Sequence, residues 1–138
     1  MMAHDFKLFP ELTNKQMQLY YLDSPHAQIT QDFRARVVKV TDGDTVRVEV
    51  DFRDFDFPVR FVNTAAPEMD EQGGEKAQSW LEEQIGGEEV DILINPKNRV
   101  GKWGRLLGEI IHRGLNINKL SVMLGYSINW RDRKQVRL

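Results

Sequence analysis

Residues 33–50, FRARVVKVTDGDTVRVEV, decide the fold of this chain. Apolar and basic side chains alternate over residues 33–37, which is the pattern of a half-buried β-strand. The phase shifts at Val37-Val38, which indicates either a β-bulge or a strand that is buried on both faces at that point. Asp42-Gly43 is a strong hairpin-turn signal, and the alternation resumes after it over residues 46–50. This stretch therefore predicts two antiparallel strands joined by a tight turn.

The remainder of the chain continues with strand and helix patterns in turn. The expected elements are a strand at 55–63, a helix at 75–85, strands at 90–94 and 106–112, and a helix at 116–124. Five short strands with a helix after the third is the plan of an OB-fold, a barrel whose face and loops often bind oligonucleotides. We therefore expect an α+β, mainly β fold: a five-stranded OB-fold barrel with two to three helices.

Three segments of the chain differ in composition. Residues 1–32 are rich in Gln and Tyr and carry one short helix signal, which begins at the Thr13-Asn14 cap and ends before Ser24-Pro25. We interpret them as an N-terminal extension that packs on the main domain or on a partner. Residues 33–130 are the expected OB-fold domain, and residues 131–138 are a basic C-terminal tail.

The composition limits the class of protein. The chain has 138 residues, of which 41% are hydrophobic and 29% charged, as in one ordinary globular domain. It has no cysteine, which excludes disulfides, thiolate metal sites and a cysteine nucleophile. No stretch approaches the ~20 apolar residues of a membrane helix, and the N-terminus lacks a secretory-signal pattern. We expect a cytoplasmic protein.

Basic residues are concentrated in one loop and in the C-terminal tail of an acidic chain. The net charge is −2, from 19 basic and 21 acidic residues, which is unlike a general nucleic-acid coat protein. Residues 95–105, the basic loop, nevertheless hold four basic residues and no acid. Such a patch suits a protein that grips a polyanion in one groove, although a solvated loop explains it equally well. The candidate nucleic-acid contacts are Lys97, Arg99, Lys102 and Trp103.

Six short motifs occur in a definite order along the chain. They are Thr41-Asp42-Gly43-Asp44-Thr45, Val59-Arg60-Phe61, Pro67-Glu68, Gly74-Glu75-Lys76-Ala77, Lys102-Trp103-Gly104-Arg105-Leu106-Leu107 and Leu124-Gly125-Tyr126. In this order and spacing, the motifs resemble those of the staphylococcal-nuclease-like (thermonuclease) family over roughly residues 34–126. The resemblance implies a five-stranded OB barrel with helices, and calcium-dependent hydrolysis of DNA and RNA.

The same resemblance implies roles for five residues. Arg60 and Arg105 are expected to be catalytic arginines, and Glu68 the general base. Asp44 matches a calcium-ligand aspartate, and Asp42 matches a nearby acid of the metal site. A guanidinium can bridge two phosphoryl oxygens, a carboxylate can deprotonate water, and calcium takes about 6–8 oxygen ligands. Plainer interpretations also stand: the two aspartates as turn residues, Arg60 as a surface residue or an ion-pair partner of Asp56, Glu68 as the start of a loop, and Arg105 as a solvated side chain.

One position departs from the family pattern. The family usually has an aspartate where this chain has Ala65, so the metal site loses one oxygen ligand and one charge. The expected consequence is weaker calcium binding, a preference for Mg²⁺ or Mn²⁺, or an inactive site. Two further hypotheses therefore remain beside the nuclease. One is a non-catalytic module of a larger assembly, such as a virion, with a protein partner or a second copy held through residues 1–32. The other is a sequence-neutral nucleic-acid binder.

Overall fold

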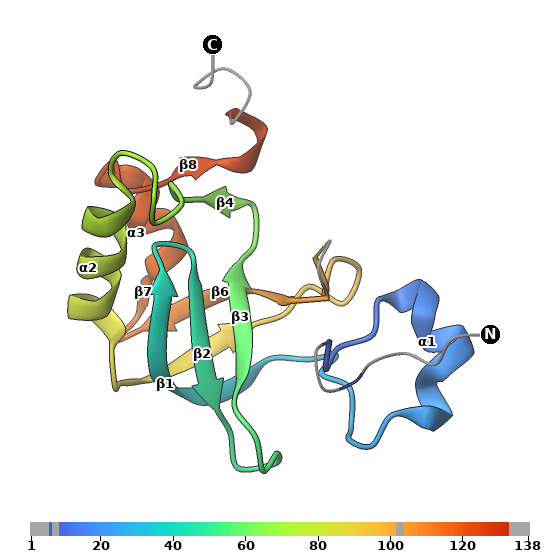
Figure 1. Ribbon diagram of the computed structural model, residues 1–138. Coiled ribbons are helices and arrows are strands. Elements are labelled where there is room, and N and C mark those ends of the chain that lie inside the picture. The colour runs from blue at the N-terminus through green and yellow to red at the C-terminus, as the bar shows by residue number, and fades with distance from the viewer. Residues whose placement is uncertain (1–5, 7–8, 102–103, 133–138) are drawn as a thin grey trace.

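Five strands close into a barrel in the computed structural model, which describes residues 6, 9–101 and 104–132 (Figure 1). The barrel strands are β1 (Phe33–Asp42), β2 (Thr45–Glu49), β3 (Phe57–Phe61), β5 (Glu89–Leu93) and β6 (Leu106–His112). They are ordered β3-β2-β1-β5-β6, and β6 closes the barrel by pairing in parallel with β3. The expected mainly β, OB-like barrel is confirmed.

Short elements complete the fold around the barrel. The helices are α1 (Asn14–Tyr20), α2 (Gly74–Ile85) and α3 (Ile117–Met123), with 3-10 turns η1 (Tyr21–Asp23) and η2 (Trp130–Asp132). Three two-residue strands, β4 (Thr64–Ala65), β7 (Leu115–Asn116) and β8 (Ile128–Asn129), occur outside the barrel, and β4 pairs with β8. The helices at 74–85 and 117–123 lie within one residue of their expected bounds, whereas strand β3 is shorter than expected.

The β1–β2 hairpin contains a β-bulge, one of the two interpretations of the phase shift at Val37-Val38. The pairing register shifts between Val37 and Lys39, and again between Val40 and Asp42. The extra residue turns the side chain of Val38 outward, while Val37 and Val40 both remain buried. Of the two interpretations of the phase shift, the bulge is therefore correct.

Helix α2 packs directly on the turn of this hairpin. Its apolar side chains Trp80, Leu81 and Ile85 are buried in the barrel core. A Cβ atom added at Gly43 would lie 2.5 Å from the Cβ of Ala77 on the helix, so a side chain larger than hydrogen does not fit there. The contact holds the 42–45 turn, and with it Asp44, in a fixed place beneath α2.

An N-terminal arm, residues 9–32, packs on the side of the barrel away from α2 and α3 (Figure 1). Helix α1 in this arm begins at the Thr13 cap, whose hydroxyl accepts a hydrogen bond from the Gln16 backbone, as the sequence predicts. Leu12 is fully buried, and Ile29 belongs to the same apolar core as the barrel strands. Of the two expectations for this segment, packing on the main domain is what the described residues show.

Candidate functional site

Arg60, Glu68 and Arg105 line one cavity of about 460 Å³ at the end of the barrel. Arg60 lies on β3, Glu68 lies in the loop between β4 and α2, and Arg105 immediately precedes β6. Strands β3 and β6 are parallel neighbours, with Arg60 in register with Leu107, so the parallel pairing brings the two arginines to the same end of the sheet. The structure therefore gathers all three residues that the family resemblance assigned to catalysis.

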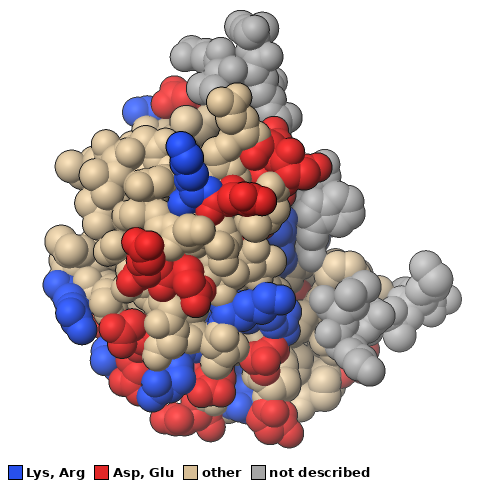
Figure 2. Space-filling view, turned by 60° about the vertical axis from the view of Figure 1, so that its left-hand side comes forward, with Lys and Arg blue, Asp and Glu red and all other residues tan. Residues whose placement is uncertain are grey.

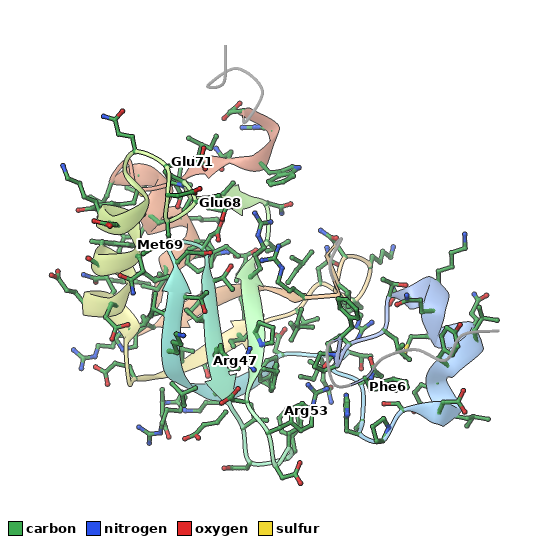
Figure 3. The ribbon with its side chains drawn as sticks, viewed as in Figure 1. Phe6, Arg47, Arg53, Glu68, Met69 and Glu71 are labelled. Atoms are coloured by element: carbon green, nitrogen blue, oxygen red, sulfur yellow. The ribbon has the colours of Figure 1, made fainter. Side chains whose placement is uncertain are left out.

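A second cavity, of about 500 Å³, shares Arg60 and Glu68 with the first. Its remaining wall comes from residues 65–67, from Glu71 and Gln72, and from the segment 125–128. The Glu71 carboxylate accepts a 2.8 Å hydrogen bond from the backbone nitrogen of Glu68, which fixes the loop that carries the proposed base. Figure 3 shows Glu68 and Glu71 together at this end of the barrel, with Arg47 farther down the sheet.

The side chain of Arg60 is held by two neighbours. Its guanidinium lies 3.4 Å from the carboxylate of Asp44 and 5.2 Å from the centre of the Trp130 ring. The alternative that Arg60 pairs with Asp56 is wrong, because Asp56 pairs with Arg47 instead. An arginine fixed by an ion pair and by an aromatic face keeps a defined orientation toward the cavity that it lines.

Asp44 and Asp42 form an interacting pair of carboxylates behind the cavity wall. Asp44 is buried, and its two oxygens accept hydrogen bonds of 3.0 Å from the Thr45 hydroxyl and the Ala66 backbone nitrogen. Burial, together with a hydrogen bond to the Asp44 carboxylate and its charge, raises the pKa of Asp42 to about 7. Two carboxylates this close disfavour full ionisation unless a cation neutralises them.

Ala65 leaves this position with one side-chain oxygen donor fewer than the family pattern. Ala65 is buried in β4 and lines the second cavity, and it contributes no side-chain oxygen. Within residues 6, 9–101 and 104–132, no group of three or more His, Cys, Asp or Glu side chains is close enough to hold a metal ion. Asp42 and Asp44 alone could hold a cation whose remaining ligands are water or phosphate oxygens.

The basic loop does not present all its cations to solvent. Arg99 is 3% exposed, and it donates hydrogen bonds to the carbonyl oxygens of Ile29 (2.7 Å) and Leu12 (2.9 Å). The prediction that Arg99 contacts nucleic acid is therefore wrong, because the N-terminal arm covers it. Lys97 is exposed, as that role requires. Lys102 and Trp103 lie outside the described residues.

Elsewhere on the surface, basic and acidic side chains are interspersed. Figure 2 shows Lys and Arg mixed with Asp and Glu over one face of the molecule. On the outer surface of strands β1 and β5, Arg34 pairs with Glu89 and Asp91 at 3.3 and 3.1 Å. Such pairing leaves little net charge there to attract a polyanion. No helix in the described part of the chain is long and apolar enough to cross a membrane.

Comparison with known proteins gives bacterial relatives. No protein-family model matches the chain. It is 33% identical, over 95 residues, to a protein named uncharacterized endonuclease in Escherichia coli O157:H7, and equally to one of that name in Escherichia coli. It is 29% identical, over 101 residues, to an uncharacterized protein of Bacillus anthracis. These alignments cover 68–69% of the chain, but 59% of the Escherichia coli proteins and 46% of the Bacillus anthracis protein. The chain thus spans about half the length of the curated relatives it matches, two of which bear an endonuclease name.

Proposed function

We propose that this protein is a nuclease of the staphylococcal-nuclease-like kind, which hydrolyses phosphodiester bonds of DNA or RNA. The observation that carries the proposal is the single cavity lined by Arg60, Glu68 and Arg105. Two guanidinium groups can stabilise the phosphoryl oxygens and a carboxylate can activate water, so these residue types suit phosphoryl transfer to water. The endonuclease name of two bacterial relatives points to the same class of substrate.

In the proposed reaction, Arg60 and Arg105 bind the nonbridging oxygens of the scissile phosphate from two sides. Glu68 takes a proton from a water molecule, whose oxygen attacks phosphorus as the bond to the leaving oxygen breaks; solvent then protonates the leaving oxygen. Each arginine stabilises charge that grows in the transition state, an effect commonly worth about 100–1000-fold in rate. General-base catalysis adds roughly 100–10,000-fold.

The divalent cation of this proposal is Mg²⁺ or Mn²⁺ in preference to Ca²⁺. Mg²⁺ is often held by one or two carboxylates together with substrate phosphate oxygens and retained waters, whereas Ca²⁺ takes about 6–8 oxygen ligands. Asp42 and Asp44 supply two carboxylates, and Ala65 supplies none. When bound, the cation would neutralise negative charge on the phosphate, and its arrival would relieve the repulsion between the two aspartates.

Cleavage of an end-labelled single strand in Ca²⁺, Mg²⁺ and Mn²⁺ tests the proposal. We expect wild type to cleave, and Arg60→Ala and Arg105→Ala each to lower the rate by at least about tenfold. Arg47→Ala is the matched control, because Arg47 lies on the barrel outside both cavities and pairs with Asp56. Cleavage at an unchanged rate in both cavity variants would overturn the assignment.

A second candidate function is a non-catalytic assembly module. The observation that favours it is an exposed apolar surface on α1 and η1, where Leu22 is 95% exposed and Leu19 is 69% exposed. Light scattering would measure the mass of wild type and of a Leu19→Ser/Leu22→Ser variant. An oligomer that the double substitution dissociates, combined with no cleavage in any metal, would support this function over the nuclease.

A further inference from the structure

The N-terminal arm is joined to the barrel by a buried cluster of charges. Glu11 of the arm is 1% exposed and lies between Arg53 of the β2–β3 loop, which is 8% exposed, and Arg99 of the basic loop. One Glu11 oxygen pairs with Arg53, and the other lies 3.4 Å from Arg99 and accepts a hydrogen bond from the Ile29 backbone. Figure 3 shows Arg53 on the side of the barrel that faces the arm. A buried carboxylate with two guanidinium partners fixes the position of every segment that contributes to it.

The same arm touches the basic loop at three successive points. The side-chain nitrogen of Asn14 donates to the Pro96 carbonyl oxygen at 2.9 Å, near the start of the loop. Arg99, in its middle, donates to the Leu12 carbonyl and to the Asn14 side chain. At its end, a Cβ atom on Gly104 would lie 2.8 Å from the ring of Phe9, so the arm packs against the residue that precedes Arg105.

Backbone hydrogen bonds connect the segment that contacts the arm to the segment that contains Arg105. The Leu107 nitrogen donates to the Arg99 carbonyl, and the Gly101 nitrogen donates to the Arg105 carbonyl, both at 2.8 Å. Residues 99–101 and 105–107 are therefore the two sides of a small hairpin. One side is anchored to the arm through Arg99, and the other side carries Arg105 into the cavity.

We infer that the N-terminal arm braces the active-site hairpin, and that Arg99 and Glu11 are positioning residues that hold Arg105 in the cavity. This inference rests on the proposed nuclease function for its catalytic consequence, but its structural part stands independently. Gly101 and Gly104 carry no side chains that could fix the conformation of the hairpin by packing. Catalysis is sensitive to such looseness, since a displacement of about 1 Å can cost roughly 100-fold in rate.

Two matched substitutions separate the brace from general stability. Arg99→Met removes one of the two guanidinium partners of Glu11, whereas Ile85→Ala truncates a buried side chain of α2, which lies on the side of the barrel away from the arm. Both substitutions disturb a buried position, but Arg99 is part of the hairpin, whereas Ile85 lines neither cavity of the site. Each variant is measured in the full chain, at a temperature at which circular dichroism shows it folded.

The first readout is hydrogen exchange, which needs no activity. We expect the amides of Gly101 and Leu107 to exchange at least about tenfold faster in Arg99→Met than in wild type, and to keep their wild-type protection in Ile85→Ala. Equally faster exchange of these amides in both variants, or unchanged exchange in both, would contradict the inference that the arm holds the hairpin in place. If the two variants show this difference in exchange but wild type cleaves no substrate, the proposed nuclease function is refuted and the structural inference stands.

The second readout is the cleavage rate under saturating substrate. We expect Arg99→Met to lower kcat by about tenfold or more, and Ile85→Ala to leave kcat within about twofold of wild type. If Arg99 acts through Arg105, adding Arg99→Met to Arg105→Ala will lower kcat no further. Independent losses that multiply in the double variant would show that Arg99 does not act by positioning Arg105.

Discussion

The guanidinium of Arg60 lies 3.4 Å from the carboxylate of Asp44, across the pairing of β3 with the start of β2. The family resemblance assigns these residues to different tasks, one to the phosphate and the other to the metal. In the structure they are direct partners, and the same aspartate also accepts hydrogen bonds from Thr45 and Ala66. The charge of Asp44 thus attracts the guanidinium of Arg60 directly.

Asp44→Asn tests this partnership. The amide keeps the shape of the side chain but loses the charge that attracts Arg60, so we expect a loss of about 1–3 kcal/mol in the free energy of unfolding. We also expect a slower cleavage rate. If Asp44 acts on cleavage only through Arg60, Asp44→Asn will not lower the cleavage rate further in an Arg60→Ala background. A further loss there, together with a raised Mg²⁺ requirement, would show that Asp44 also serves the cation.

Gly43→Ala tests how closely the hairpin turn packs against α2. The added methyl group would lie 2.5 Å from the Cβ of Ala77 and 2.8 Å from that of Ala66, so either the helix or the turn must move. Overpacking of this kind costs about 1–3 kcal/mol, and we expect urea unfolding to show a loss of that size. Because the displaced turn carries Asp44, cleavage should slow as well.

Removing the opposing methyl group provides the control for this prediction. In the double variant Gly43→Ala/Ala77→Gly, the loss of stability should be smaller than the sum of the two single losses. Stability losses that add exactly would mean that the side chains at positions 43 and 77 do not contact each other in the Gly43→Ala variant.

Local patterns of sequence predicted the parts of the fold that depend on neighbouring residues. The alternation over 33–37, the bulge near Val38 and the capping of α1 each follow from a few adjacent residues. The motif order also predicted which two arginines meet in the cavity, since it reflects a barrel in which β3 and β6 pair.

The burial of Arg99 could not be predicted in the same way. Its partner Glu11 is 88 residues away in the sequence, and nothing near either residue distinguishes it from a solvated charge. Burial lowers the pKa of Arg99, and nearby Glu11 opposes that effect, so the guanidinium depends on a contact that appears only when the arm docks on the barrel. Glu71, beside Glu68, was also missed, because an exposed acid in a polar loop has no distinguishing pattern.

The raised pKa of Asp42 predicts a pH-dependent penalty to stability. Its value of about 7 in the folded protein compares with about 3.9 in an unfolded chain, so the folded state favours the protonated form. The contribution of this carboxyl is most favourable below about pH 4 and is lost as pH rises through 7. In a metal chelator, Asp42→Asn should therefore gain stability relative to wild type as pH rises over that range. Urea unfolding at several pH values measures the difference, and a difference that stays flat or shrinks would contradict it.

Ala65→Asp tests whether one missing carboxylate sets the cation preference. Ala65 lines the cavity that also contains Arg60 and Glu68, and the backbone nitrogen of the next residue, Ala66, donates to Asp44, so an aspartate at 65 adds an acid beside Asp44. Because calcium affinity rises with ligand charge, we expect calorimetry to show Ca²⁺ binding tightened by about tenfold or more, and Ca²⁺-dependent cleavage to increase. Ala65→Asn is the matched control, since it adds an oxygen of similar reach without a charge. Equal calcium affinity in the two variants would mean that Asp42 and Asp44 do not form a cation site with position 65, and the metal would have to be held elsewhere or brought by the substrate alone.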